Sequence, residues 1–233
     1  MRRLVADLRS DTVTLPLRSM LDAVSSSALG DDVFGDDPTV NLLEREAATL
    51  LGKEAALFVV SGTMGNLLAV MSHCEAGRGS EMIVGDKSHI ALYEGGSSAS
   101  LAGVFSRLVP TEHDGTIALS TLRGAVQTPD IHHTVTRLIC LENTHNVCGG
   151  VPVSKEYTDQ VGALAREHGL KVHMDGARLF NAAAALNCSA KDLVSSCDSV
   201  MFCLSKGLAA PVGSMLVGDK KFVEKARYFR KMV

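Results

Sequence analysis

The sequence predicts an α/β domain built around a largely parallel sheet. Apolar runs of strand length alternate with segments of helical periodicity along all 233 residues, which is the pattern of successive strand–helix units. A hydrophobic fraction of 46% against 21% charged residues can supply an extensive core. Aromatic residues contribute only 4%, so we expect a core of aliphatic side chains, methionine and alanine.

The expected strands are short apolar segments that stop at polar residues or glycine. They cover residues 55–60, 82–84, 104–109, 137–141, 171–174 and 199–204. Helices are expected between them. One covers 42–50, with Thr39 as a possible cap and Gly52 as its stop, and others cover 63–75, 154–168 and 219–232.

The chain shows no internal repeat, low-complexity segment or linker that would divide it. We therefore expect an N-terminal arm over residues 1–14 and one large domain over 15–233. The arm sequence Asp7–Thr14 is too polar for a core strand, and its simplest interpretation is an exposed extended segment. The acidic stretch 30–38 is either a solvated loop or a shaped loop that meets a ligand or a second subunit.

Composition excludes several classes of protein. A net charge of −3 without long Lys/Arg runs argues against nucleic-acid binding. No apolar stretch approaches the roughly 20 residues that span a membrane, and the first residues lack the apolar region of a signal peptide. The six cysteines form no CxxC pair and are interpreted as reduced thiols. We expect a cytoplasmic protein whose partners are small molecules or copies of itself.

Lys206 is the most informative residue, because it follows the apolar run 201–204 and precedes Gly207. Asp175 ends a second apolar segment in the same way. Pyridoxal phosphate (PLP) requires a lysine amine for its Schiff base and an anion that keeps its pyridine nitrogen protonated. The pair therefore predicts a PLP site. The alternative is a buried Asp/Lys ion pair, because buried charges are usually paired.

A candidate phosphate site lies at residues 61–63, Ser-Gly-Thr, which follow one predicted strand and open a helix. Gly62 and Thr63 would offer backbone N–H groups, a hydroxyl and the positive end of the helix dipole to an anion. The alternative is an ordinary helix cap.

Two histidines are candidates for catalysis. His89 follows a strand at the expected site edge of the sheet, where an imidazole could stack on a planar ring or move a proton. His145 follows another buried strand among several polar residues. His113, His132, His133 and His168 lie in polar surroundings and are expected on the surface. Neither HExxH nor a Cys/His set with zinc spacing is present, so no metal site is predicted.

Six motifs occur together in one order. They are Asp7–Thr14, Val33–Asp36, Ser61–Met64, Glu142–Asn146, His173–Arg178 and Ser205–Gly207 with 211–214. In this order they resemble the L-threonine aldolases of the low-specificity type, within the PLP-dependent β-eliminating lyase and threonine aldolase family. The resemblance is collinear from about residue 6 to residue 232.

The resemblance implies the aspartate-aminotransferase-like large domain of PLP fold type I, with a mixed, mostly parallel seven-stranded sheet. It implies retro-aldol cleavage of threonine or allo-threonine to glycine and acetaldehyde, in a homotetramer assembled as a dimer of dimers. By motif, the resemblance implies that Lys206, beside Ser205, holds the cofactor, that Asp175 pairs with its ring nitrogen, and that Gly62 and Thr63 bind its phosphate. It implies that His89 stacks on the ring and that His145 acts in proton transfer at the β-hydroxyl. The substrate carboxylate would be bound by Ser10, Arg178 and Lys231.

The chain departs from the family pattern in two places. Family members continue beyond the segment matching 230–232 into a small C-terminal domain, whereas this sequence stops at Val233. We therefore expect Phe222, Val223, Ala226 and Phe229 to be left without enough to bury them, and threonine cleavage by this chain to be weak or absent. Ala209 replaces a common glycine, and this change is expected to be tolerated.

Two other functions remain open from sequence. One is a different PLP-dependent lyase or an aminotransferase, which would share the same lysine. The other is a catalytically inactive paralogue that folds or binds a partner subunit.

Overall fold

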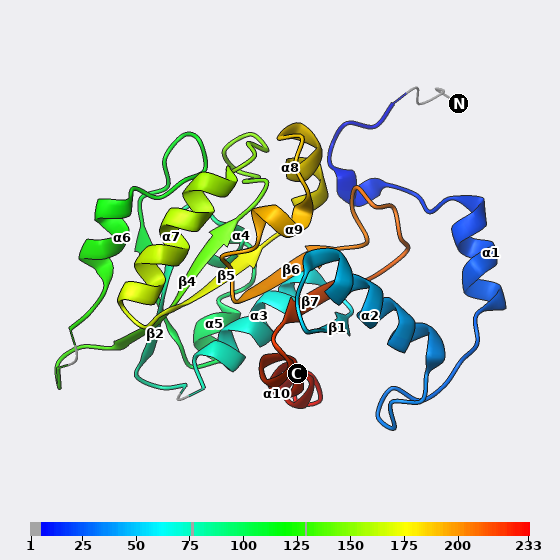
Figure 1. Ribbon diagram of the computed structural model, residues 1–233, viewed down its shortest axis with the longest axis horizontal. Helices are drawn as coiled ribbons and strands as arrows, with labels where there is room; N and C mark the ends of the chain where they lie inside the picture. The colour runs from blue at the N-terminus through cyan, green and yellow to red at the C-terminus, as the bar shows by residue number, and fades with distance from the viewer. Residues whose placement is uncertain (1–5, 76, 129) are drawn as a thin grey trace.

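The computed structural model describes residues 6–75, 77–128 and 130–233. Within them, seven strands form one sheet with helices on both faces (Figure 1). The strands are β1 (Ala55–Val59), β2 (Ser80–Gly85), β3 (Phe105–Val109), β4 (Val135–Glu142), β5 (Lys171–Asp175), β6 (Ser199–Cys203) and β7 (Ser214–Gly218). Their order across the sheet is β1-β7-β6-β5-β4-β2-β3.

The sheet is mixed but mostly parallel. All strands from β6 to β3 pair in parallel, and β7 is antiparallel to both of its neighbours. The fold predicted from the sequence is therefore confirmed. The six strands expected individually are present, whereas β7 was not among them because its run is short and follows directly on a proline- and glycine-containing turn.

The helices are α1 (Arg18–Ser26), α2 (Pro38–Leu51), α3 (Gly62–His73), α4 (His89–Leu92), α5 (Ser97–Ser100), α6 (Leu119–Ala125), α7 (Lys155–Glu167), α8 (Leu179–Ala185), α9 (Ala190–Leu193) and α10 (Lys220–Arg230), with a 3-10 turn η1 (Asp11–Val13) in the arm. The stop at Gly52 is confirmed, since this residue takes the left-handed conformation at φ 62°. The cap at Thr39 is wrong. The Asp37 carboxylate caps α2 instead, by accepting bonds from two backbone N–H groups.

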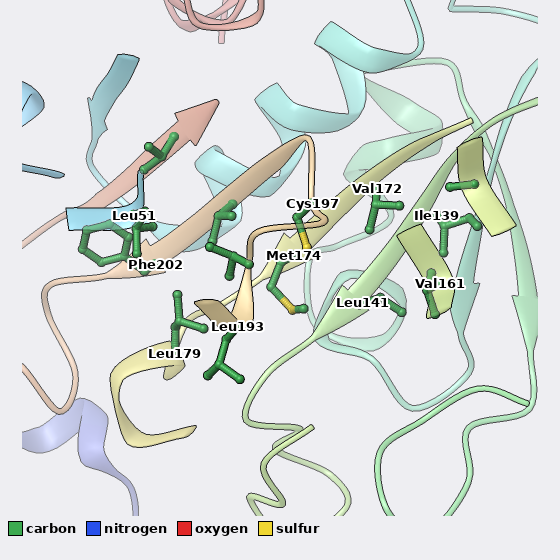
Figure 2. Close-up of a cluster of buried hydrophobic side chains, with 14 of the residues drawn as sticks. Leu51, Ile139, Leu141, Val161, Val172, Met174, Leu179, Leu193, Cys197 and Phe202 are labelled. Carbon is green, nitrogen blue, oxygen red and sulfur yellow. The ribbon is translucent and has the colours of Figure 1, made fainter. Parts of the chain in front are cut away.

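Two apolar layers cover the two faces of the sheet. One layer joins the sheet to α2, α6, α7, α8 and α9, and Figure 2 shows its side chains, among them Leu51, Val161 and Phe202. On the other face, Leu68 and Ala69 of α3 pack with Phe222 and Val223 of α10. The aliphatic core expected from composition is therefore present.

The expectation that α10 would lack burial is wrong. Phe222, Val223 and Ala226 are 6%, 4% and 0% exposed, and Phe229 packs against the same cluster. These side chains are buried because α10 packs against α3 and β1 and completes the apolar layer on this face of the sheet. The Phe222 ring also stacks on His73, with ring centroids 4.5 Å apart.

Helix α1 has no buried residue and lies at the periphery, connected to α2 by a loop that turns at residues 32–35 (Figure 1). In the described part of the chain, no helix combines the length and the apolar character needed to cross a membrane.

Candidate active site

The carboxyl ends of the parallel strands border a cavity of about 460 Å³. Eight of the ten site residues predicted from the sequence line this cavity: Lys206, Asp175, Gly62, Thr63, His89, Ser205, Ser10 and Arg178. They come from the segments after β1, β2, β5 and β6 and from the N-terminal arm. The parallel register therefore gathers residues that lie far apart in the sequence.

Helix α3 points its N-terminus at the cavity. The Ser61 hydroxyl accepts a bond from the Met64 N–H at 3.1 Å, which caps the first turn. Gly62 lies tightly against β6, since a Cβ there would come within 3.0 Å of the Cys203 sulfur and of the Met201 methyl carbon. This close approach holds the first turn of α3 at the cavity wall, where it can bind an anion.

Asp175 is 2% exposed at the end of β5. Its Oδ2 accepts a bond from Asn66 Nδ2 at 2.9 Å, and its Oδ1 accepts one from the Ala177 N–H at 3.1 Å. No salt bridge joins Asp175 to Lys206 within the residues that the structure describes. The arrangement thus differs from the buried ion pair that was the sequence-based alternative.

His89 is held by two carboxylates. Its Nδ1 lies 2.9 Å from Glu94 Oε1, and its backbone N–H donates to Glu142 Oε2 at 2.7 Å. The hydrogen bond to Glu94 raises the pKa of His89, and burial raises the pKa of Glu94. The ring is thereby fixed beside the cavity with its Nδ1 engaged.

Glu142 ends β4 and is itself buried. Burial and the negative charge of Asp175 raise the pKa of this carboxyl to about 7. Its two oxygens accept bonds from the backbone N–H groups of His89 and Asn146. Glu142 therefore connects, by hydrogen bonds, the loop that follows β2 with the loop that follows β4.

The N-terminal arm is largely exposed, as expected from the sequence, and it also borders one side of the cavity through Ser10 and Thr12. Ser10 lines the cavity and caps η1, and the Thr14 hydroxyl donates to the Lys206 carbonyl at 2.8 Å. Asp11 receives two bonds from the Arg178 guanidinium, at 2.9 and 2.7 Å. The predicted carboxylate-binding arginine is thus paired with a carboxylate of the chain itself.

Two predicted site residues lie outside the cavity. The His145 ring packs against Gly115 and lines a separate small pocket, while the adjacent Asn146 reaches the main cavity. Burial lowers the pKa of His145, and its Nδ1 has no hydrogen-bond partner among the described residues. Lys231 follows the last turn of α10 and borders a different cavity with Asp32.

One group of side chains has the spacing of a metal site. Ligand atoms of His89, Glu94 and Asp175 lie within 4.8 Å of one another. Each of these side chains already makes hydrogen bonds to protein groups, through Asn66, Ala177 or one another. We therefore assign no ion to this group.

Sequence reasoning missed Asn66, Glu94 and Glu142. Asn66 stands within the helix that follows Ser61, where an asparagine attracts no attention until the strand beside it is known. Glu94 precedes two glycines and resembles a surface loop residue, although it is buried. The available sequence signal was the pair of acids Glu142 and Asp175, each at the end of an apolar strand.

The residues present fit PLP. The cavity offers a helix N-terminus for a phosphate, a buried carboxylate for the ring nitrogen, a lysine amine and an imidazole. The hydrogen bonding also fits, because Asp175 is bonded to the Asn66 amide and a backbone N–H and forms no ion pair with a basic side chain among the described residues.

The chain is similar to proteins of known name. It is 53% identical over 227 residues to low-specificity L-threonine aldolase 1 of Arabidopsis thaliana, covering 97% of this chain and 63% of that protein. It is 47% identical over 226 residues to the low specificity L-threonine aldolase of Escherichia coli strain K12, covering 97% and 66%. The chain therefore spans about two thirds or less of the length of these relatives.

The fold is shared with a threonine aldolase of Leishmania major, at a TM-score of 0.81 and 22% identity, over 96% of this chain and 65% of that one. This likeness supports the architecture alone. The resemblance to threonine aldolases inferred from the six motifs is confirmed by the sequence relatives. The model of the beta-eliminating lyase family matches residues 7–233, and the chain belongs to this family.

Proposed function

We propose that this chain carries the cofactor-binding part of a PLP-dependent aldolase that cleaves L-threonine and L-allo-threonine to glycine and acetaldehyde. The observation that carries the proposal is the meeting of Lys206, the buried Asp175 and the N-terminus of α3 in one cavity, without a direct bond between the two charges. The names of the relatives support the choice of substrate.

Lys206 would hold the cofactor through its amine, with Gly62 and Thr63 at the phosphate and Asp175 at the ring nitrogen. Ser205 borders the same cavity beside the lysine. When bound, PLP supplies an electron sink for the carbanion left by cleavage of the Cα–Cβ bond. The protein's part is to hold that ring in one orientation and to keep charge opposite its nitrogen.

His89 would stack on the ring, since Glu94 fixes its orientation beside the cavity. Ser10 and Arg178 would bind the substrate carboxylate, the arginine through the two-bond geometry it already shows with Asp11. We propose His145 for proton transfer at the β-hydroxyl through an intervening water, because its ring lies outside the cavity next to Asn146, which lines it. Burial lowers the pKa of His145, which favours the neutral imidazole that can accept a proton.

We further propose that the protein is a homo-oligomer, assembled as a dimer of dimers. Helix α1 and its flanks expose Leu15, Leu17, Leu21, Val24 and Leu29, and no residue of α1 is buried within the chain. A second copy would cover this apolar face. Light scattering after gel filtration should give a multiple of the 24.6 kDa chain mass, and a Leu21→Glu variant should lower it. A monomer at all concentrations would contradict the proposal.

The test of function begins with absorbance. Adding PLP to the protein should produce the visible band of a lysine-bound cofactor, and Lys206→Ala should abolish the band without changing the circular dichroism spectrum. Adding L-threonine should then release acetaldehyde at a low rate, measured with a coupled dehydrogenase against protein lacking PLP, because the chain spans only about two thirds of the length of its relatives. Release of ammonia or a keto acid in place of acetaldehyde would favour another PLP reaction, and a band that survives Lys206→Ala would exclude this lysine.

A further inference from the structure

Asn66 connects two carboxylates beneath the cavity. This side chain is 1% exposed and borders the cavity from the second turn of α3. Its Nδ2 lies 2.8 Å from Glu94 Oε1 and 2.9 Å from Asp175 Oδ2, so both amide hydrogens are used. Since Glu94 also holds His89, one amide group links the acid expected at the ring nitrogen with the imidazole expected at the ring face.

A buried chain of hydrogen bonds continues from the other end of this amide. Asn66 Oδ1 lies 3.0 Å from His173 Nε2, and His173 Nδ1 lies 2.8 Å from Ser199 Oγ. Ser199 Oγ in turn lies 2.7 Å from His73 Nε2. His173 and Ser199 are completely buried, so water cannot replace these partners.

The direction of every proton in this chain follows from the carboxylate end. The oxygen of Asn66 cannot face Asp175 and Glu94, because acceptors would then face acceptors. Oδ1 therefore faces His173, which must carry its hydrogen on Nε2. His173 Nδ1 then accepts the Ser199 hydroxyl hydrogen.

The far end of this hydrogen-bonded chain also has one proton arrangement. Ser199 has given its only hydrogen to His173, so His73 must donate from Nε2 to the serine oxygen. Each group donates toward the carboxylates, and the chain has one permitted orientation. Burial also lowers the pKa of His73 to about 4 and that of His173 to about 3, which agrees with two neutral rings.

We propose that Asn66 is a positioning residue of this site. The hydrogen bonds from His73 through Ser199 to His173 fix the orientation of its amide, so that both amide hydrogens face Asp175 and Glu94. The amide keeps the Asp175 carboxylate aimed into the cavity and couples it to the His89–Glu94 pair. The consequence for cofactor binding rests on the proposed function, whereas the proton arrangement does not.

The first experiment uses the protein without cofactor. Nitrogen-15 NMR of labelled histidines at pH 7 should show His173 as a neutral ring with hydrogen on Nε2 alone, its signal assigned by its loss in His173→Gln. In Asn66→Leu, His173 loses its acceptor and should populate both tautomers. A ring with hydrogen on Nδ1, or a charged ring, in the unmodified protein would overturn the proposal.

The second experiment adds PLP and measures its dissociation constant and visible spectrum. Asn66→Leu and the nearly isosteric Asn66→Asp should weaken binding about tenfold or more, as expected for a lost hydrogen bond to a charged group of about 1.5 kcal/mol. Ser72→Ala is the matched control, since this buried hydroxyl of the same helix has no partner among the described residues. It should stay within about twofold of the unmodified protein.

The outcomes separate the two proposals. If the unmodified protein shows no PLP band, the proposed function fails, and the histidine tautomers still decide the hydrogen-bonded chain. If the band is present and both Asn66 variants match Ser72→Ala in affinity and spectrum, Asn66 has no positioning role. Should Asn66→Leu fail to fold by circular dichroism, Asn66→Asp preserves the volume and carries the comparison.

Discussion

Asp11 and Arg178 form a two-bond ion pair across 167 residues of sequence, with guanidinium–carboxylate distances of 2.9 and 2.7 Å. Both side chains are partly buried, and Asp11 belongs to the arm that borders the cavity. In this geometry the chain presents to Arg178 the same chemical group as an amino-acid substrate does. An incoming carboxylate must therefore share or displace Asp11.

Asp11→Asn should bind amino acids more tightly, because the internal carboxylate no longer competes for the guanidinium. We expect the dissociation constant for glycine, measured by calorimetry on the PLP-loaded protein, to fall about threefold or more. Asp7→Asn is the control, since this arm carboxylate pairs with Arg9 away from Arg178. Unchanged or weaker glycine binding in Asp11→Asn would show that Asp11 supports the arginine rather than competing for it.

Asp175→Asn should impair cofactor function more than cofactor affinity, because the phosphate contacts remain while the ring nitrogen loses its charged partner. The structure adds a cost in stability. Both oxygens of Asp175 accept hydrogen bonds, and an amide offers only one acceptor to Asn66 and the Ala177 N–H. Urea denaturation should show a loss of about 1–3 kcal/mol. Unaltered turnover and unaltered stability together would contradict this assignment.

Acid should destabilise the fold through His73 and His173, whose pKa values are lowered by burial to about 4 and about 3. In the unfolded chain the pKa of histidine is near 6.5, so below this pH the unfolded chain binds protons that the buried rings of the folded chain do not bind. The free energy of unfolding therefore falls as pH falls from about 6.5 toward 4. Each ring contributes a slope of about 1.4 kcal/mol per pH unit in that range.

Denaturation midpoints measured between pH 7 and pH 4.5 test this prediction. Glu142, with its pKa raised to about 7, opposes the trend, because its contribution to stability is lost as pH rises. His173→Gln should reduce the acid slope by about one proton, and His113→Gln, at an exposed position, should leave it unchanged. Equal slopes in both variants would mean that His173 is not the neutral buried ring described above.

Phe222→Ala should cost roughly 3–5 kcal/mol of unfolding free energy, since it empties the layer between α10, α3 and β1 and removes the ring stacked on His73. The matched control is Tyr228→Ala on the same helix, where the ring is 69% exposed and the expected change is below about 1 kcal/mol. Chemical denaturation measures both. Similar small losses in the two variants would restore the expectation that α10 is poorly buried.

Ala209→Gly should stabilise the protein by about 0.5–1 kcal/mol. Ala209 closes the turn after Lys206 by donating its N–H to that residue's carbonyl, and it does so at φ 59°, where a Cβ is disfavoured. The expectation from sequence that alanine is tolerated here is thus compatible with a measurable strain. Ala210→Gly, at an ordinary conformation, should lose stability instead, and thermal unfolding distinguishes the two.

The strand–helix alternation predicted the sheet because buried parallel strands are mostly apolar, as in β6, where Ser199 is the one polar residue. The site followed from the same rule, since residues placed directly after strands share one edge of the sheet. Asn66 and Glu94 escaped notice because their roles depend on neighbours across the sheet, which no local pattern records. The burial of α10 was misjudged for a related reason, because its partners α3 and β1 lie far away in sequence.

The position of β1 has a consequence for biosynthesis. Although β1 is the first strand of the chain, in the described structure it joins the sheet through β7, the last strand, with Ala55 opposite Gly218. During translation, β1 therefore remains without its partner strand until the ribosome has made the chain as far as Gly218. Such late pairing slows folding and leaves an apolar strand exposed in the nascent chain, so β1 is where a chaperone would be needed.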